Sequence, residues 1–538
     1  MVNQILYNRW AVSLFVFLTV FIYFWNIWIN DIWIPNEAFY AESAREMLEK
    51  GNFLDIYYNY EPRFNKPPMT YWMVAVSYLI FGINEFAARF PIVLSALGTN
   101  ILTFLIAKEL YGKKVALFSA AAVAFSFQFV INSRYASPEI PLAFFFTLTL
   151  YLFLVGYKRR KWGFIFLSYI ALGLTVLTKG FPYIIVIGGI VFLFLLIETN
   201  FSIKGFFKEV LFLKLHIGIP VLFAVGLSWY VYMYLKFGQE FVDVTLQETI
   251  KRALGKKSQG LSSLFFYIPV ILWGFLPYSL TFYYSFFHSL KGKIREFSFV
   301  FSWFIVMFVI FTIAKGKIPV YMIQGHIPMA IFVGYYLSNY TPSKVLEKIL
   351  YYGSLVVPVA VITALNVFLI FSFKLDYLYY IMALFPIFYI IRYKDLLLAP
   401  FLSMLTTFLI FAVSILPLVE KFRPYDKIGQ VINDNVPERD IPLIVEGFFW
   451  HNLPFYARRK VLRDYPIDKI VEYSKNKPVL ALVTEKGLDR IDNPQILWTG
   501  RLYRRGSESR FAVFLKYVKR ALNGDYSGFE VRYLIFKR

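Results

Sequence analysis

The chain contains a long series of apolar runs, most of them close to the length that a membrane-spanning helix needs. Such a helix takes about 20 apolar residues, and the first run extends from Trp10 to Ile29. Hydrophobic residues make up 58% of the 538 residues and charged residues 17%, whereas soluble domains carry about 25% charged residues. The pattern predicts an all-α polytopic membrane protein. The first run is too long for a signal-peptide core and has no Ala-x-Ala-like cleavage site, so we expect it to be retained as a span.

One short apolar run, Met69 to Phe81, decides the expected topology. Its length favours an interfacial or re-entrant helix over a span. If it does not cross, six short basic connections fall on the side of the N-terminus, which the positive-inside rule assigns to the cytoplasm. These connections hold Lys108/Lys113/Lys114, Lys158–Lys161, Lys204/Lys208/Lys214, Lys291/Lys293/Arg295, Lys344/Lys348 and Arg392/Lys394. We therefore predict about 13 spans, near residues 10–30, 88–108, 114–132, 139–157, 161–178, 181–198, 214–235, 262–287, 296–314, 317–338, 347–371, 375–391 and 395–416, and an outer C-terminus.

The net charge of +22 is spread over many short loops. Charge in this arrangement orients helices in a membrane, whereas a nucleic-acid surface would gather it on one face. We therefore expect contacts with membrane lipids and none with nucleic acid. The chain has no Cys, which excludes disulfides and thiolate metal sites.

The composition changes near Leu418, where charged residues become frequent. Strand-like runs at Ile441–Glu446, Pro478–Thr484 and Arg510–Val518 surround a helical pattern at Pro466–Lys475. We predict a transmembrane domain over residues 1–417 and a small soluble α/β domain over 418–538. Residues 31–87 form the first outer loop on the same side as that domain.

Two acidic residues stand at expected membrane boundaries. Glu37 follows Pro35-Asn36, and Glu139 follows Ser137-Pro138. An acid at such a place is costly unless it is solvated or paired, so a functional role is the first hypothesis. The alternative is that each acid offsets the dipole at a helix N-terminus.

Cations from distant parts of the chain converge on the same expected face. Lys66 precedes Pro67-Pro68, Lys179 lies between two spans, and Lys315 and Lys317 lie near Tyr321 at another turn. Convergent cations suit an anionic head group. The alternative for any single Lys is that it extends toward lipid head groups.

The polar stretch from Pro35 to Met47, PNEAFYAESAREM, resembles the signature P-D-E-x-x-Y-A-E-x-A-R-E-M of the aminoarabinose transferase family. These are lipid A glycosyltransferases of the GT-C fold (glycosyltransferase family 83), related to protein O-mannosyltransferases. Lys66-Pro67-Pro68 with Tyr71-Trp72 resembles the family's E-K-P-P-x-x-Y-W. Further matches in type and order are found at Asn84–Pro91, Ser133–Glu139, Leu177–Gly180 and Lys315–Tyr321.

The resemblance implies a polyprenyl-phosphate-linked sugar as donor, transfer on the outer face, and juxtamembrane helices in the first outer loop. Three positions depart from the family. Asn36 replaces an Asp, Glu139 replaces an Asp, and Asn65 replaces a Glu. None of the four histidines, His216, His288, His326 and His451, falls in the outer loop 236–260. A Glu/His zinc site like that of the aminoarabinose enzyme would therefore lose both of its ligands, so we predict no metal there and no cofactor.

The candidate site residues divide into three groups by expected role. Glu37 and Glu139 would orient or deprotonate the acceptor. The carrier phosphate would be bound by Lys66, Arg252, Lys315, Lys317, Tyr321 and Arg134. The substrates would be positioned by Asn36, Tyr40, Arg45, Asn65 and Lys179. Preorganised cations would stabilise the charge that develops on the leaving phosphate.

We therefore predict a glycosyltransferase, acting as a monomer in the bacterial inner membrane, that modifies lipid A or a similar envelope acceptor on the periplasmic face. One alternative is protein O-mannosyltransfer to Ser or Thr. Another is a lipid-sugar transporter, which would be expected to show inverted repeats and helices broken near the midplane. The attacking oxygen could belong to a phosphate, which needs little help from a base, or to a sugar hydroxyl, which needs Glu37 or Glu139.

Overall fold

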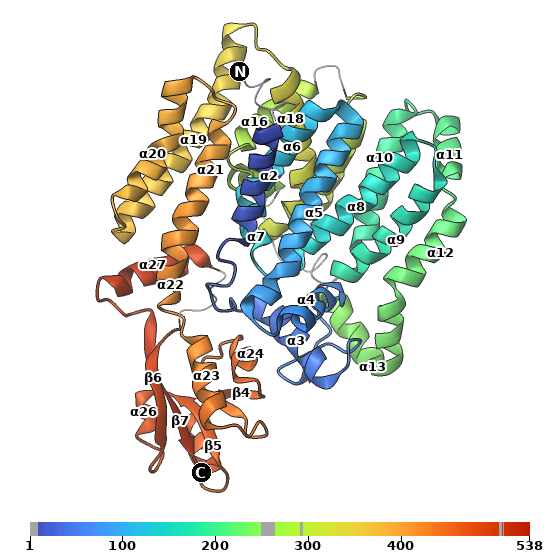
Figure 1. Cartoon of the computed structure of the whole chain (residues 1–538). Coiled ribbons are helices and arrows are strands. Elements are labelled where there is room, and N and C mark those ends of the chain that lie inside the picture. The colour runs from blue at the N-terminus through green and yellow to red at the C-terminus, as the bar shows by residue number, and fades with distance from the viewer. Residues whose placement is uncertain (1–8, 249–263, 291–293, 505–507, 509) are drawn as a thin grey trace.

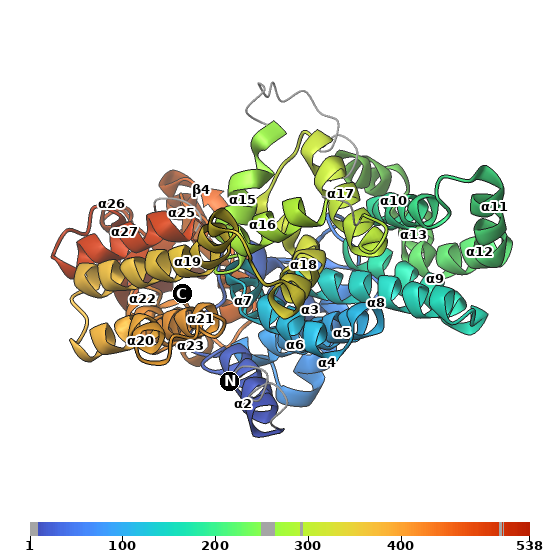
Figure 2. The same ribbon diagram turned by 90° about the horizontal axis from the view of Figure 1, so that it is seen from above.

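The computed structural model describes residues 9–248, 264–290, 294–504, 508 and 510–538. A helical bundle occupies most of the molecule, and a small sheet with its helices lies below it (Figure 1). Seen from above, α19–α21 lie at one end of the bundle and α10–α13 at the other, with α7, α16 and α18 between them (Figure 2).

The helices of the bundle and the outer loop have the following bounds: α2 Arg9–Phe24, α3 Asn36–Lys50, α4 Met69–Phe81, α5 Glu85–Tyr111, α6 Lys113–Ala124, α7 Phe127–Ser133, α8 Glu139–Lys158, α9 Trp162–Lys179, α10 Pro182–Glu198, α11 Ile203–Phe212, α12 Leu215–Gly226, α13 Ser228–Leu246, α15 Tyr267–Gly274, α16 Ser279–Ser289, α17 Ser298–Ile313, the 3₁₀ helix η3 Pro319–Gly325, α18 His326–Asn339, α19 Val345–Phe373, α20 Leu378–Tyr393, α21 Ala399–Ile410, the π-helical η4 Phe411–Ile415 and α22 Leu416–Glu420.

The bundle has the character of a multi-pass membrane domain. Among the described residues, five helical stretches are long and apolar enough to span a bilayer, or up to seven if two bent pairs each form one span. The five are α5, α8, α9, α19 and Ala399–Glu420, and the pairs are α6–α7, bent by 65°, and α11–α12, bent by 53°. Every predicted span contains at least one described helix, but several are short or broken, so the count of 13 stays a prediction.

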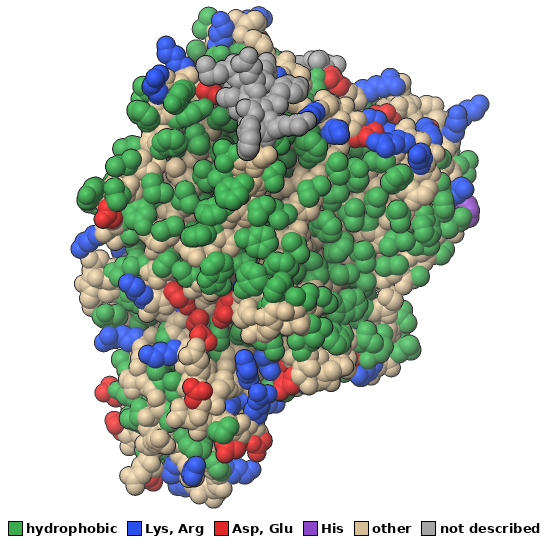
Figure 3. All heavy atoms as spheres, in the orientation of Figure 1, with side chains coloured by type: hydrophobic (Ala, Val, Ile, Leu, Met, Phe, Trp, Pro, Cys, Tyr) green, Lys and Arg blue, Asp and Glu red, His purple; other side chains and the backbone are tan. Residues whose placement is uncertain are grey.

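The charged side chains on the surface also agree with a membrane domain. In Figure 3 a broad band of apolar side chains crosses the molecule, with Lys and Arg gathered along its upper edge. Charges of both signs mark the domain below the band. This arrangement agrees with the basic connections that the sequence places on one side.

The first outer loop folds into two helices and a hairpin at the lower end of the bundle (Figure 1). Helix α3 begins directly after Pro35 and ends at Gly51, which adopts the left-handed conformation with φ 62°. The hairpin pairs β1 (Tyr57–Tyr58) with β2 (Glu61–Pro62). Helix α4 has the bounds of the short apolar run, and one of its faces exposes Val76, Leu79, Ile80 and Phe81. A short helix with one exposed apolar face is typical of an interfacial element.

The C-terminal part contains a five-stranded mixed sheet of order β4-β3-β5-β7-β6. Strand β3 is parallel to β4 and β5, whereas β7 is antiparallel to β5 and β6. The strands are β3 Leu443–Glu446, β4 Val461–Tyr465, β5 Val479–Val483, β6 Gln495–Tyr503 and β7 Phe529–Lys537, and the helices are α23 Tyr425–Asn435, α24 Leu453–Ala457, α25 Ile467–Tyr473, α26 Glu485–Leu488 and α27 Phe511–Leu522.

The strand predicted at Arg510–Val518 is wrong, because most of this run lies in helix α27. Phe514, Val518 and Ala521 are buried on one side of the helix, at spacings of four and three residues. This is the helical period rather than the alternation of a strand. The runs predicted around β3, β5 and α25 do form those elements.

The sheet domain is attached to the bundle by a buried ion cluster. Arg423 is fully buried and pairs with Glu508 and Glu420, each at 2.9 Å. Its guanidinium also donates to the carbonyl oxygens of Asp31 (3.0 Å) and Ile32 (3.1 Å) in the outer loop. The cluster therefore fixes the C-terminal domain against the segment that leads into α3.

Candidate active site

A cavity of about 920 Å³ lies between the bundle, the outer loop and the C-terminal domain. Its walls come from α7, the start of α8, the α9–α10 turn, η3 and the segment from α21 to α22. Aromatic and aliphatic side chains dominate the lining. The charged residues of the lining are Lys66, Arg89, Arg134, Glu139, Lys179, Glu248 and Glu508. A few charges in a large apolar cavity are typical of a site that binds a lipid with a polar head.

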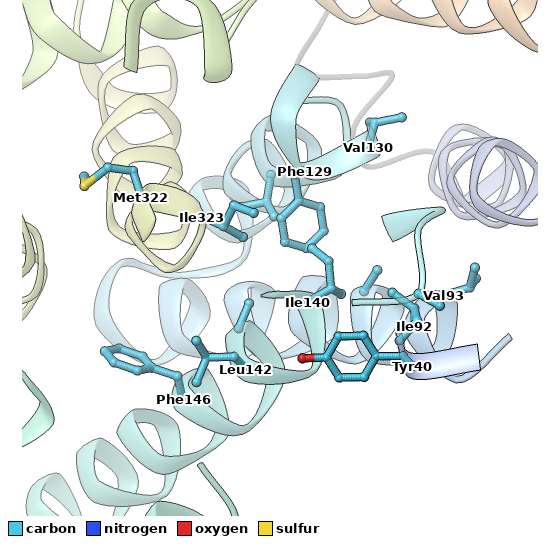
Figure 4. Close-up of a cluster of buried hydrophobic side chains, with 14 of the residues drawn as sticks. Tyr40, Ile92, Val93, Phe129, Val130, Ile140, Leu142, Phe146, Met322 and Ile323 are labelled. Carbon is cyan, nitrogen blue, oxygen red and sulfur yellow. The ribbon is translucent and has the colours of Figure 1, made fainter. Parts of the chain in front are cut away.

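The cavity wall is supported by a packed core. Figure 4 shows Phe129, Ile140 and Ile323 together where α7, α8 and η3 meet, with Tyr40 from α3 close by. All four side chains are buried. A core of this kind holds the polar groups of the wall in fixed positions.

Glu139 presents a carboxylate to the cavity beside a cation. It is the first residue of α8, directly after Pro138, and its Oε2 accepts a hydrogen bond from Lys179 Nζ. Lys179 ends α9, and its Nζ lies 5.1 Å from the centroid of the Tyr321 ring. All three residues line the cavity. The arrangement can hold an acceptor hydroxyl at the carboxylate and an anion at the ammonium.

Glu37 has a different environment, because its side chain is fully buried and is not part of the cavity lining. Its two oxygens accept hydrogen bonds from Nε and Nη2 of Arg89, both at 2.8 Å. They also accept the backbone N–H groups of Trp33 and Ala136, again at 2.8 Å. A carboxylate with four donors is occupied as a structural acceptor. The predicted catalytic role of Glu37 stays a prediction, and this geometry favours a positioning role.

Arg134 brings a half-buried positive charge to the cavity. One of its nitrogens, Nη1, donates to the carbonyl oxygens of Ile22 (2.7 Å) and Tyr23 (3.3 Å). The described residues place no carboxylate within ion-pair distance of it. Burial, together with the nearby Arg89, lowers the pKa of Arg134. A cation that lines an apolar cavity without a counter-ion favours the binding of an anion there.

Lys66 lines the cavity next to Asn65 and forms an ion pair with Glu248 at 3.0 Å. Asn36 also lines the cavity, at the start of α3. Tyr40 lines it one turn further along α3, and its ring stacks on Tyr71 with centroids 4.6 Å apart. Burial raises the pKa of Tyr40 well above its usual value, so its hydroxyl stays neutral.

The remaining predicted residues lie outside the lining or outside the described residues. Arg45 is buried against Glu42 and Glu49 of its own helix, at 2.7 and 2.8 Å. Lys315 and Lys317 alternate with the lining residues Gly316 and Ile318, and Lys317 Nζ donates to the Ala314 carbonyl oxygen at 2.8 Å. Arg252 falls within 249–263, outside the described residues.

Sequence reasoning missed three charged residues of the lining: Arg89, Glu248 and Glu508. Arg89 lies within the Asn84–Pro91 motif, and this position in a family motif was the signal that could have found it. In the structure it pairs with Glu37. Glu508 comes from the C-terminal domain, more than 350 residues from the motifs of the outer loop, and no local pattern marks it.

The donor atoms near Asn65 do not suit zinc. Zinc sites in proteins use Cys, His and carboxylate ligands, but this position offers an amide and a Glu248 carboxylate that is paired with Lys66. No group of three or more His, Asp or Glu side chains that could hold a metal occurs among the described residues. The prediction that the protein uses no metal stays untested.

Comparison with known proteins shows what the chain is related to. Residues 9–242 match the family model of dolichyl-phosphate-mannose-protein mannosyltransferase. An uncharacterized protein of Aquifex aeolicus is 38% identical over 500 residues, which cover 93% of this chain and 95% of that protein. Undecaprenyl phosphate-alpha-4-amino-4-deoxy-L-arabinose arabinosyl transferase 1 of Proteus mirabilis is 28% identical over 347 residues.

The chain belongs to the GT-C glycosyltransferases related to protein O-mannosyltransferases. It is therefore an enzyme, a membrane glycosyltransferase. Its match with the Proteus mirabilis transferase covers 63% of this chain and 61% of that protein. Its fold is similar to that of ArnT from Cupriavidus metallidurans in the crystal structure with bound undecaprenyl phosphate, with a TM-score of 0.76, 21% identity, and coverage of 90% of this chain and 96% of that chain.

Proposed function

We propose that this glycosyltransferase moves a sugar from a polyprenyl-phosphate carrier to lipid A or a similar envelope glycolipid. The proposed site of transfer is the cavity, at the periplasmic face of the bacterial inner membrane. The observation that carries the proposal is Arg134, a half-buried cation that lines an apolar cavity and for which the described residues supply no carboxylate. A carrier phosphate would supply the missing negative charge, and its prenyl chain would contact the apolar wall.

The reaction requires the acceptor oxygen to attack the anomeric carbon of the donor sugar. The bond between that carbon and the phosphate oxygen breaks, and polyprenyl phosphate leaves with the electron pair. Arg134, Lys66 and Lys179 would stabilise the charge on the leaving phosphate, because all three line the same cavity. Preorganised charges of this kind supply a large part of many rate enhancements. Lys315, Lys317, Tyr321 and Arg252 remain proposed contacts of the same phosphate.

Glu139 is the carboxylate best placed to receive the acceptor proton, since it lines the cavity while Glu37 does not. This placement favours a sugar hydroxyl as the attacking group. A phosphate nucleophile would need no base at neutral pH, because its second pKa is near 6. Asn36, Asn65 and Tyr40 would orient the sugars by hydrogen bonds, and Glu37 and Arg45 would hold α3 in place.

Two further results support the proposal. The relatives include transferases named for undecaprenyl phosphate-linked aminoarabinose. The basic upper edge and the domain below the apolar band in Figure 3 agree with a cytoplasmic upper face and a periplasmic C-terminal domain.

Mass spectrometry of lipid A from cells with and without the protein tests the proposal. A sugar-sized mass increase on lipid A that depends on the protein is expected. Unchanged lipid A, together with newly glycosylated Ser or Thr in envelope proteins, would instead support protein O-mannosyltransfer. That second candidate is favoured by the match of residues 9–242 to the mannosyltransferase family model.

A further inference from the structure

The second half of α13 is fixed against the outer loop on one side of the cavity. Helix α13 bends at Gly238, whose φ of 57° and ψ of −134° are not helical, and Figure 1 shows the helix beside the outer loop at the lower end of the bundle. Phe64 of the outer loop packs against Phe237 and Phe241, on either side of this bend, with ring centroids 4.9 and 5.7 Å apart. These contacts bring the segment that carries Lys66 to the end of α13.

Polar contacts connect the first half of α13 to the same loop. The Asp55 carboxylate accepts a hydrogen bond from the Tyr232 hydroxyl at 3.1 Å and pairs with Lys236. The Trp229 indole N–H donates to the Leu54 carbonyl oxygen at 2.9 Å. Together with the aromatic contacts, these bonds fix both halves of α13 against the outer loop.

Glu248 lies two residues beyond α13 and lines the cavity together with Thr245. Its Oε2 accepts a hydrogen bond from Lys66 Nζ at 3.0 Å, and Lys66 Nζ also donates to the Asn65 carbonyl oxygen at 3.0 Å. The side chains of Lys66 and Glu248 are 23% and 29% exposed. Both members of the pair line the cavity, so an anion that binds Lys66 also meets the Glu248 carboxylate.

The charges of the cavity lining leave one positive charge in excess among the described residues. Every charged residue of this lining except Arg134 has a partner of opposite sign within ion-pair distance. The pairs are Lys66–Glu248, Lys179–Glu139, Arg89–Glu37 and Arg423–Glu508. A lining with this balance matches a ligand that carries one negative charge.

The two forms of the carrier differ in charge. The donor holds its phosphate between the prenyl chain and the sugar, so this diester carries one negative charge. Transfer breaks the bond to the sugar, and the phosphate leaves with the electron pair as a monoester. A phosphate monoester has a second pKa near 6 and therefore carries close to two negative charges above neutral pH. The donor matches the single excess charge of the described lining, whereas the product exceeds it by one.

We propose that Glu248 makes the site select the monoanionic donor over the dianionic product, so that polyprenyl phosphate is released after transfer. Its carboxylate repels a phosphate held at Lys66, and this repulsion grows with the charge of the phosphate. When the product leaves, the ion pair of Lys66 and Glu248 forms again. This role rests on the proposed function, because it takes the donor to be a polyprenyl-phosphate-linked sugar.

Equilibrium binding to the full-length protein, in nanodiscs of zwitterionic lipid at pH 8, tests this role. The probes are polyprenyl phosphate, a dianion at that pH, and its methyl ester, a monoanion with the same prenyl chain. The variants are Glu248→Gln, which removes the charge, and Glu248→Asp, which keeps it. The matched control is Glu240→Gln, because Glu240 lies in the same half of α13, is exposed and does not line the cavity.

Glu248→Gln is expected to bind polyprenyl phosphate about tenfold more tightly than the unaltered protein does, which corresponds to about 1.4 kcal/mol. Repulsion is proportional to the charge of the ligand, so the methyl ester should gain half of this free energy, or about threefold in affinity. Glu248→Asp should keep most of the discrimination between the probes. The control should bind both probes as the unaltered protein does.

Equal gains for the two probes in Glu248→Gln would show that Glu248 only competes for Lys66, and would overturn the proposal. No gain with either probe, or weaker binding of both, would also overturn it. The same gains in Glu240→Gln would assign the effect to the net charge of the protein and contradict a role of the cavity carboxylate. Because neither donor sugar nor acceptor is present, the binding result does not depend on transfer. Discrimination between the probes in a protein that shows no transfer would count against the proposed function and not against Glu248.

Discussion

Replacing Glu37 and Glu139 by Gln, one at a time, separates a structural carboxylate from a chemical one. In Glu37→Gln, the new amide can no longer accept all four hydrogen bonds that the carboxylate accepts from Arg89, Trp33 and Ala136. It also leaves the Arg89 guanidinium buried without its counter-ion. Breaking a buried pair by removing one partner costs about 3–5 kcal/mol. We therefore expect a clear loss of stability in this variant.

In Glu139→Gln the expected loss is in turnover. The carboxylate lines the cavity, and its partner Lys179 also reaches the cavity, so the ammonium can be solvated when the charge is removed. A positioned general base contributes about 10²–10⁴-fold to the rate. We expect a loss of turnover within this range, with donor binding unchanged.

The assay compares initial rates of sugar transfer with the temperature of unfolding, followed by tryptophan fluorescence, for both variants in the same nanodiscs. A Glu139→Gln enzyme that keeps turnover within about tenfold of the unaltered protein would refute the base assignment and indicate a phosphate nucleophile. A Glu37→Gln enzyme with normal stability and a thousandfold loss of rate would transfer the role of base to Glu37.

Three further predictions follow from other parts of the structure. Lys66→Ala should abolish transfer and weaken carrier binding, because a charge-assisted hydrogen bond to the carrier phosphate, worth about 1.5–3 kcal/mol, is lost. Unchanged turnover in this variant would mean that Lys66 contacts only lipid head groups. Cysteines at Asn84 and Asn523 should react with an impermeant thiol reagent applied from outside, whereas one at Lys204 should be protected; protection at Asn84 alone would make Met69–Phe81 a span. Burial, followed by the charges of Arg463 and Arg63, lowers the pKa of His451 to about 4. The pKa of this histidine in the unfolded chain is about 6.5, so the unfolded state binds a proton before the folded state does as the pH falls. The free energy of unfolding should therefore be unaffected by His451 above pH 6.5 and should fall by about 2 kcal/mol between pH 7 and pH 5. Denaturant titrations of the unaltered protein and of His451→Gln at both pH values check this, and an equal loss in both proteins would contradict it.

The sequence predicted those parts of the fold that depend on local patterns. Pro35 and Gly51 marked the ends of α3, and the short run Met69–Phe81 became a helix with those bounds. The wrong strand prediction at Arg510–Val518 also came from a local pattern. The run rich in apolar and aromatic residues suggested a strand there, but its buried positions follow a helical period.

The site was harder to predict, because its properties depend on contacts between distant residues. Glu37 and Glu139 had equivalent sequence surroundings, each after a proline-containing turn at a helix start. Only the fold shows that Arg89 and two backbone N–H groups occupy the Glu37 carboxylate, whereas the Glu139 carboxylate lines the cavity. Glu508 could not be anticipated at all, since it reaches the outer loop from a domain that follows the last predicted span.

Sugar transfer by the purified protein is the most direct test of the proposed activity. The protein in proteoliposomes would receive a polyprenyl phosphate carrying a radiolabelled sugar, with lipid A as acceptor, and the lipids would be separated after reaction. We expect label in lipid A and the release of one polyprenyl phosphate for each sugar transferred, with both signals lost in Lys66→Ala. Label that stays on the carrier with every polyprenyl-linked sugar tested, while the folded protein still binds the carrier, would contradict it.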